Sequence, residues 1–127
     1  MSLSLRTIRA LTTILGMVHT ASAFACSCAP LTFEQAVAHL SVVFEGRVIA
    51  AETNESEYSL VARVSVARRI KGGVDETASV VTSSASSMCG YPLVAGDVLT
   101  FGGDFDSTGR LTTNMCVMVP LNPRPHR

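Results

Sequence analysis

Alternating apolar and polar residues mark most of the chain beyond position 25 as short β-strands. Residues 58–70 alternate between an apolar and a mixed face, as in an antiparallel strand that is buried on one side. Runs containing Val, Ile, Leu or Phe predict further strands at 41–51, 77–83, 98–101 and 111–119. Turn signals separate these strands, which indicates a small antiparallel barrel or sandwich, a class that includes five-stranded Greek-key barrels.

A different periodicity precedes the first strand. In residues 33–40 the apolar positions fall three or four residues apart, which predicts a short amphipathic helix. Thr32 and Gln35 have the spacing of a capping box, in which each side chain bonds the backbone N–H of the other residue. His39 falls in the last turn, where a positive charge complements the helix dipole; a metal ligand is the alternative role for this side chain.

Glycine and charged residues predict local features between and within the strands. Gly46 suggests a bulge in the first strand, and the acidic residues 52–57 are expected to form a solvated hairpin loop. Arg68, Arg69 and Lys71 are interpreted as solvated charges at the end of a strand, because surface Lys and Arg are the ordinary case. An anion-binding site is the alternative for these three residues.

The first 25 residues have the three parts of a secretory signal peptide. Arg6 and Arg9 supply a positive start, residues 10–18 are mostly apolar, and small residues follow. The apolar run is too short to span a bilayer, which requires about 20 residues. We therefore expect residues 1–25 to be removed, and the protein to be secreted to an extracellular or periplasmic compartment.

The cleavage position decides what the mature chain begins with. Cleavage after Ala23 leaves Phe24 as the first residue, and cleavage after Ala25 leaves Cys26 with a free α-amino group. Attachment of a lipid to Cys26 is a third alternative, and it would anchor the protein to a membrane.

The charge balance argues against electrostatic attraction to nucleic acid or to acidic membranes. The 127-residue chain has ten basic and ten acidic side chains, and loss of Arg6 and Arg9 leaves eight basic and ten acidic. No linker or internal repeat divides the mature chain. We expect a monomer with one domain over residues 26–121 and a flexible tail at 122–127.

Four cysteines in a small exported domain indicate two disulfides. Cys26 and Cys28 cannot easily bridge to each other, because so short a ring strains disulfide geometry. In an extended segment both side chains face the same surface. The two remaining connectivities each tie this segment to Cys89 and Cys116, and each bridge is worth about 4 kcal/mol in the chain-entropy model.

Other uses of the cysteines are disfavoured by export. Cys89 could act as a nucleophile with His39 or His126, but an exported cysteine with three companions is expected to be oxidised. A zinc site made by all four cysteines does not match the common C-x₂₋₄-C spacing. The sequence lacks a phosphate loop, an HExxH motif and a GxSxG motif. We therefore expect neither enzymatic activity nor a cofactor.

Several motifs, taken together, resemble one known family. In order and spacing they are similar to the netrin-like domain of the tissue inhibitors of metalloproteinases, over nearly the whole mature chain. The motifs are Cys26-Ser27-Cys28-Ala29-Pro30, the predicted helix at 33–40, VVFEGRV at 42–48, RIKG at 69–72, the stretch 82–88 leading into Cys89-Gly90, and the run 109–116 that ends in Cys116 before Val119-Pro120.

The resemblance implies a fold, a disulfide pairing and a function. The fold is an OB-like five-stranded antiparallel Greek-key barrel with a short N-terminal helix, and the pairing is Cys26 with Cys89 and Cys28 with Cys116. The function is inhibition of a zinc metalloendopeptidase, with the α-amino and carbonyl groups of Cys26 chelating the zinc of the target. Ser27 would point into the specificity pocket, and a loop would pack beside it, formed by Ser84, Ala85, Ser86, Ser87 and Met88.

The sequence also differs from that family. The cysteines of a third disulfide are missing, the sequence stops soon after Pro120 where the animal proteins continue into a C-terminal domain, and the loop at 52–57 is short. An exported or surface-anchored netrin-like binding module without inhibitory activity is therefore the alternative function. A nucleic-acid-binding OB domain is the third alternative. It is disfavoured because the mature chain is slightly acidic and lacks a basic face with interspersed aromatic residues.

Overall fold

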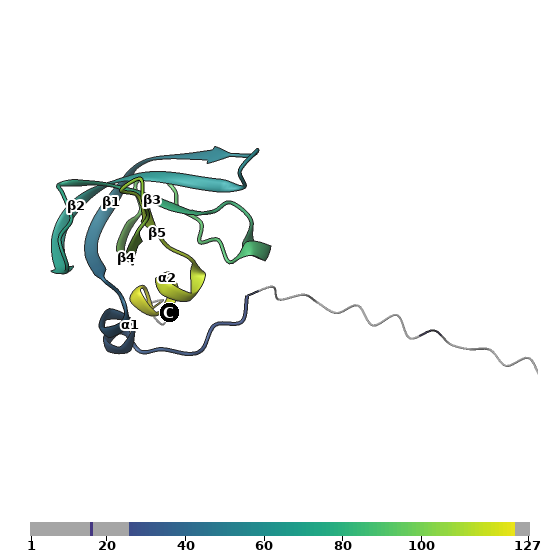
Figure 1. Cartoon of the computed structure of the whole chain (residues 1–127), viewed down its shortest axis with the longest axis horizontal. Helices are drawn as coiled ribbons and strands as arrows, with labels where there is room; N and C mark the ends of the chain where they lie inside the picture. Colours follow the sequence, from purple (N-terminus) through teal and green to yellow (C-terminus); the bar gives the residue numbers. More distant parts are fainter. Residues whose placement is uncertain (1–15, 17–25, 124–127) are drawn as a thin grey trace, which may run out of the picture.

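Five strands of the computed structural model close into a ring (Figure 1), in the order β1-β2-β3-β5-β4. The structure describes residue 16 and residues 26–123, so the predicted signal peptide lies outside the described residues except for Gly16. The elements are α1 (Phe33–His39), β1 (Val42–Asn54), β2 (Ser59–Lys71), β3 (Thr77–Ser83), the 3-10 helix η1 (Ser86–Met88), β4 (Val98–Phe105), β5 (Leu111–Thr112) and α2 (Met115–Leu121). The mainly β fold with a short N-terminal helix is as predicted.

The sheet is mixed, and the prediction of a fully antiparallel barrel is wrong at one pair. β5 lies antiparallel to β4 but parallel to β3, with Val80 opposite Leu111. The other neighbouring pairs are antiparallel. Geometry requires this result, because strand direction cannot alternate all the way around a closed ring with an odd number of strands.

The predicted bulge at Gly46 is confirmed. The pairing of β1 with β2 changes register between Glu45 and Gly46, which is one of three such shifts along these two long strands. A side chain at position 46 would lie 2.6 Å from Val64 Cγ1 and 2.7 Å from the Ser65 carbonyl oxygen. Glycine is therefore required where the backbones approach, and the bulges bend β1 so that it pairs with both β2 and β4.

Two apolar clusters stabilise the fold. The larger one fills the ring, where the rings of Phe44 and Phe101 stack with centroids 5.4 Å apart. The smaller one lies outside the ring, where Val43 packs with Ala36 of α1 and Leu121 of α2. Val43 and Phe44 point to opposite faces of β1, and both are fully buried because the ring covers one face and the helices cover the other.

The predicted helix and its capping box are confirmed. The Thr32 hydroxyl accepts from the Gln35 N–H at 3.1 Å, and the Gln35 side chain accepts from the Thr32 N–H at 2.9 Å. His39 is exposed in the last turn. The Lys71 ammonium group donates to the carbonyl oxygens of Val37 and Ala38 at 2.8 and 3.2 Å, so it satisfies the C-terminal end of α1.

The interpretation of the three basic residues as merely solvated is therefore incomplete. Besides the bonds of Lys71 to α1, the Arg69 guanidinium donates to the Val74 carbonyl oxygen at 2.5 Å. Arg68 forms a two-pronged ion pair with Glu45 on the neighbouring strand, at 2.7 and 3.2 Å. Each basic side chain has a partner within the fold, which leaves little basis for an anion site.

The last part of the chain differs most from the prediction. β4 continues to Phe105 instead of ending at 101, and β5 ends at Thr112. The residues expected to extend the last strand to 119 form α2, because the Asn114 side chain caps a helix by accepting from the Val117 N–H at 3.2 Å. Met118 and Leu121 are buried three residues apart, which is a helical spacing.

Asn122, the first residue of the expected tail, is bonded to β4. The Asn122 side chain accepts from the Thr100 N–H and donates to the Thr100 carbonyl oxygen, both at 2.8 Å. This amide pairs with the β4 backbone as a neighbouring strand would, so it fixes the end of α2 against the sheet. Residues 124–127 lie outside the described residues.

Candidate functional site

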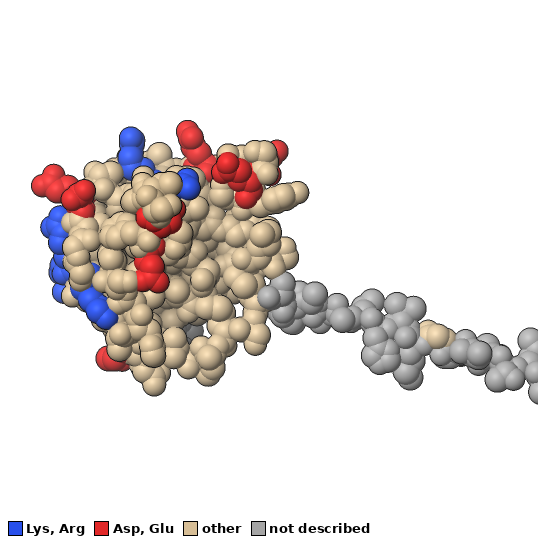
Figure 2. Space-filling model, viewed as in Figure 1, with Lys and Arg blue, Asp and Glu red and all other residues tan. Residues whose placement is uncertain are grey.

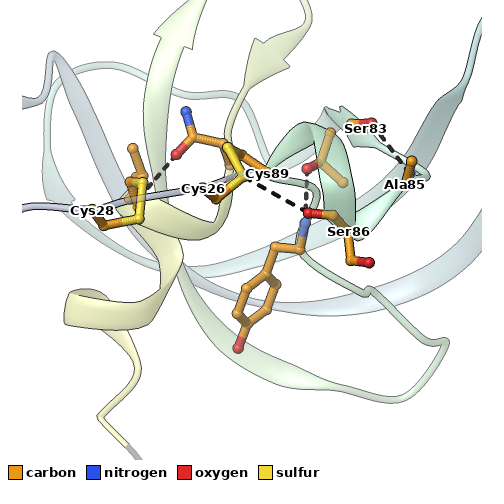
Figure 3. Close-up of a disulfide and its surroundings, with 11 residues drawn as sticks. Cys26, Cys28, Ser83, Ala85, Ser86 and Cys89 are labelled. Carbon is orange, nitrogen blue, oxygen red and sulfur yellow. Dashed lines mark hydrogen bonds between the residues drawn. A yellow bond between two sulfur atoms is a disulfide. The ribbon is translucent and has the colours of Figure 1, made fainter. Parts of the chain in front are cut away.

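Residues 26–31 lie outside every helix and strand. We call Cys26–Leu31 the strip. Two disulfides hold it: Cys26–Cys89 (Figure 3) and Cys28–Cys116. Their Cα atoms are 5.3 and 5.2 Å apart. The pairing that the family resemblance implied is therefore confirmed. The partners are 63 and 88 residues away along the sequence, so each bridge closes a long loop and constrains the unfolded chain strongly.

The first anchor of the strip is the loop that follows β3, and its backbone is internally bonded. The Ser83 hydroxyl accepts from the Ala85 N–H at 3.2 Å, and the Ala85 carbonyl oxygen accepts from the N–H groups of Met88 and Gly90 at 3.0 and 3.2 Å. A side chain at position 90 would lie 2.0 Å from the Ser83 carbonyl oxygen, so only glycine fits there. This loop therefore has one well-defined shape.

The loop presents three serines, an alanine and a methionine near Cys26, and none of them is charged. The Cys26 sulfur lies 3.7 Å from the Ser86 carbonyl oxygen (Figure 3), a close contact rather than a hydrogen bond because the disulfide sulfur carries no proton. Met88 is 58 % exposed, and Ser84, Ser86 and Ser87 are exposed, whereas Ala85 is half-buried. Ser27 is also exposed. The residues predicted to contact a protease thus lie along the disulfide that joins the strip to the loop.

The end of the β1–β2 hairpin supports this loop from the other side. The Tyr58 carbonyl oxygen accepts from the Ser84 N–H at 2.9 Å and from the Ser83 hydroxyl at 3.3 Å. Tyr58 has a φ of 50°, and its side chain is exposed. Next to these bonds, a hollow of about 330 Å³ lies between the hairpin and the loop. It is lined by Thr53, Leu60, Ser83, Ser84, Ser86, Gly90, Pro92 and Leu93.

The second anchor of the strip is α2, which the sequence prediction missed. Cys116 lies in the first turn of this helix, and the Met115 N–H donates to the Cys89 carbonyl oxygen at 2.8 Å. The two anchor points are therefore bonded to each other as well as to the strip. Asn114, a polar residue that can cap a helix, was the sequence signal for a helix start at this point.

The strip and α2 enclose a groove of about 400 Å³. It is lined by Cys26, Cys28, Ala29, Pro30 and Leu31 from the strip and by Met115, Cys116, Val119 and Pro120 from α2. The α2 residues recur at positions i, i+1, i+4 and i+5, so they form one side of the helix. Sequence reasoning missed this groove because it placed Cys116 on a strand.

Charged residues are absent from the segments that build the site. No Asp, Glu, Lys or Arg occurs in residues 26–33, 77–96 or 111–123. In Figure 2 the charged side chains gather over other parts of the visible face, and the region beside the start of the described chain is uncharged. The shifted ionisable groups lie on the ring of strands and in the turn between β4 and β5: the hydrogen bond from Arg68 lowers the pKa of Glu45, and the hydrogen bond from the Thr108 hydroxyl lowers the pKa of Asp106.

The described residues do not form a metal centre of their own. No three His, Cys, Asp or Glu side chains within this part of the chain are placed to hold a metal ion. The alternatives of a cysteine-based zinc site and of a Cys89 nucleophile are wrong, because all four cysteines are in disulfides. No helix in the described range is long and apolar enough to cross a membrane.

Comparison with known proteins adds no family assignment. No family model matches the chain, and no curated protein matches it in sequence. Two disulfides are typical of proteins in an oxidising compartment, such as the extracellular space or the periplasm.

Proposed function

We propose that the protein is an exported inhibitor of zinc metalloendopeptidases, similar to the tissue inhibitors of metalloproteinases, with an OB-like Greek-key barrel as its scaffold. The mature chain then begins at Cys26. One observation carries this proposal: two disulfides fix the segment Cys26–Leu31 beside an internally hydrogen-bonded loop of small, uncharged residues. Such an edge can enter the cleft of a protease without having to become ordered first.

In this mechanism, Cys26 reaches the target's zinc with two atoms. A catalytic zinc keeps a coordination position open for water or substrate, and a neutral amine together with a carbonyl oxygen can occupy it. An α-amino group has a pKa of about 7.7–8.0, so losing its proton to bind the metal at neutral pH costs little. The Cys26 side chain is committed to Cys89, which holds the backbone atoms of Cys26 in place.

The neighbouring residues supply selectivity. Ser27 is exposed next to Cys26, and we propose that its side chain enters the pocket that accepts a substrate side chain. Ser84, Ser86, Ser87 and Met88 then contact the rim of the cleft. The apolar and flexible Met88 side chain suits such a contact, because methionine adapts to irregular surfaces.

The test begins with mass spectrometry of the exported protein, to establish that Cys26 is the unblocked first residue. The native protein is then compared with a variant carrying one extra Ala before Cys26, in inhibition assays against a panel of zinc metalloproteases. The extension moves the amine by about 3.3–3.6 Å. Zinc–nitrogen bonds are about 2.0–2.1 Å long, so this shift removes the bond. We expect the extended protein to lose inhibition while both disulfides remain intact.

Two further variants sharpen this test. Acetylation of the native amine should abolish inhibition without lengthening the chain, and Ser27→Leu should change which proteases are inhibited. Equal potency of native and extended proteins would show that chelation is wrong. A free Cys26 terminus without inhibition of any protease would favour the binding module, and a mature chain that begins at Phe24 or carries lipid would exclude chelation.

A further inference from the structure

The chain contains three asparagines, and the fold uses them differently. The Asn114 side chain caps α2, and the Asn122 side chain bonds to the backbone of β4, so both are needed for structure. Asn54 is the last residue of β1 and is exposed. Within the described residues, its side chain bonds only to that of Ser56, two positions further along the chain. Asn54 is thus the asparagine whose side chain is available for chemistry.

The sequence around Asn54 has the pattern of an N-glycosylation acceptor. This motif is Asn, then any residue except Pro, then Ser or Thr, and residues 54–56 are Asn-Glu-Ser. The Ser56 hydroxyl donates to the Asn54 carboxamide oxygen at 2.7 Å, so the two groups that define the motif lie together in one turn. Asn114 and Asn122 have neither Ser nor Thr two positions further along the chain.

The position of Asn54 leaves room for an oligosaccharide. Thr53 lies opposite Leu60, which packs on the interior of the ring, so the next residue, Asn54, points to the outer face of the sheet. β4 pairs with β1 only as far as Arg47, so β2 is the only described strand that pairs with β1 at Asn54. Residues 52–58 are all exposed, and the end of this hairpin lies apart from the strip (Figure 1). An exposed hairpin end in an exported chain is the setting that this motif requires.

We propose that Asn54 is a modification site, at which the exporting cell attaches an N-linked oligosaccharide. The donor is an oligosaccharide joined through pyrophosphate to a membrane lipid, and a transferase of the exporting membrane supplies a base. A bond forms between the Asn54 carboxamide nitrogen and the anomeric carbon of the first sugar, while the bond from that carbon to the pyrophosphate oxygen breaks. The lipid pyrophosphate leaves with the electron pair, and the carboxamide gives up one proton to the base. This site requires export but not the proposed inhibitory function.

Mass spectrometry of the exported protein tests this proposal. Trypsin cleaves after Arg47 and after Arg63, and the peptide between them contains Asn54 and no other asparagine. We expect this peptide to carry the mass of an oligosaccharide, and peptide N-glycosidase should remove it and leave Asp at position 54. The peptides that contain Asn114 and Asn122 should be unmodified. An exported protein in which the 48–63 peptide is entirely unmodified would overturn the proposal.

Variants of the full chain, produced in cells that add N-linked glycans, identify the attachment atom. Asn54→Gln and Ser56→Ala should each abolish the modification, and Ser56→Thr should keep it, because Thr also supplies a hydroxyl. Ser59→Ala is the matched control, since Ser59 lies opposite Asn54 on β2 but outside the motif, and it should leave the modification unchanged. Both disulfides should be found in every variant by peptide mapping, because none of the substituted side chains is buried.

Each other outcome contradicts the proposal in a distinct way. A modification that survives Asn54→Gln but is lost in Ser56→Ala would place the sugar on the Ser56 hydroxyl. A modification that survives Ser56→Ala would show that the motif is not recognised. A chain that these cells fail to export would also overturn the proposal, because the transfer takes place at the exporting membrane. If the glycan is present but no protease is inhibited, the Asn54 site is upheld and the inhibitor proposal fails.

Discussion

In the closed ring of β1–β5, called the barrel from here on, Phe44 and Phe101 are fully buried and stack on each other, and every strand is bonded to two neighbours. In the strip, Ser27, Ala29 and Pro30 are exposed and belong to no strand or helix. The barrel gains its stability from burial of apolar area, whereas the strip has little area to bury and is fixed by two covalent bonds. This difference explains how an exposed segment can keep one shape.

The two regions are nevertheless connected at the anchor points. Cys89 and Cys116 belong to segments that the barrel orders, and the Met115 N–H joins them by donating to the Cys89 carbonyl oxygen. The Thr113 N–H also donates to the carbonyl oxygen of Val81 on β3, at 2.9 Å. The barrel therefore fixes the positions of Cys89 and Cys116, and the two disulfides fix the strip to these cysteines. Damage to the barrel should disturb the strip, but release of the strip should leave the barrel folded.

The largest effect is expected from Phe101→Ala. Removing this ring from the filled interior should lower the free energy of unfolding by about 3–5 kcal/mol, through lost burial and the cavity that remains. Urea unfolding of the oxidised mature protein measures this change. Phe105 provides a matched control on the same strand, because it is 44 % exposed, and Phe105→Ala should cost far less. Similar losses from both substitutions would show that the interior does not dominate stability.

A second prediction concerns the strip. Replacing Cys28 and Cys116 together by Ser should lower the free energy of unfolding by about 2–5 kcal/mol. Backbone mobility measured by NMR relaxation should rise over residues 27–31 while β1 and β4 stay ordered, because the ring makes no use of this bridge. An unchanged melting temperature would mean that the bridge adds nothing to stability. An equal rise in mobility in the strip and in the ring would contradict the separation of the two regions.

The sequence predicted best those elements whose signals are local. The capping box located the start of α1, and the boundaries predicted for β3 agree with the structure. The parallel pair of β3 and β5 could not be found from strand propensity, because it follows from closure of the ring. The groove was missed because the segment after Thr112 contains Val, Met and Cys residues that suit a strand as well as a helix, and the Asn114 cap decides between them.

The disulfide pairing illustrates a different limit. Residue types and spacing left two connectivities open, and the choice between them came from the family resemblance. In physical terms the choice depends on which anchor lies at which end of the strip, and this depends on the path of β3, β5 and α2 around the ring. No local signal contains that information. The inhibitory role stays a proposal for a related reason, since it depends on a partner.

The smallest expected effect concerns acid, and it also separates the two regions. The hydrogen bond from the Thr108 hydroxyl, at 2.6 Å, and that from the Arg110 N–H, at 3.0 Å, lower the pKa of Asp106. The Arg68 side chain lowers the pKa of Glu45 in the same direction. A carboxyl whose pKa is lower in the folded state stabilises the protein above its unfolded pKa, about 3.9 for Asp and 4.3 for Glu. That contribution is lost as the pH falls through the folded value.

The melting temperature should therefore fall below about pH 4, and it should fall less steeply in Asp106→Asn than in the native protein. Glu55→Gln removes an exposed carboxylate in the hairpin turn and controls for the change in net charge. The strip carries no acidic or basic side chain, so the backbone mobility of residues 27–31, measured by NMR relaxation, should respond to acid only when the barrel itself opens. If Asp106→Asn has the same pH dependence as the native protein, the hydrogen bonds to this carboxylate do not contribute to stability. If the strip loosens first, it depends on titrating groups that lie outside it.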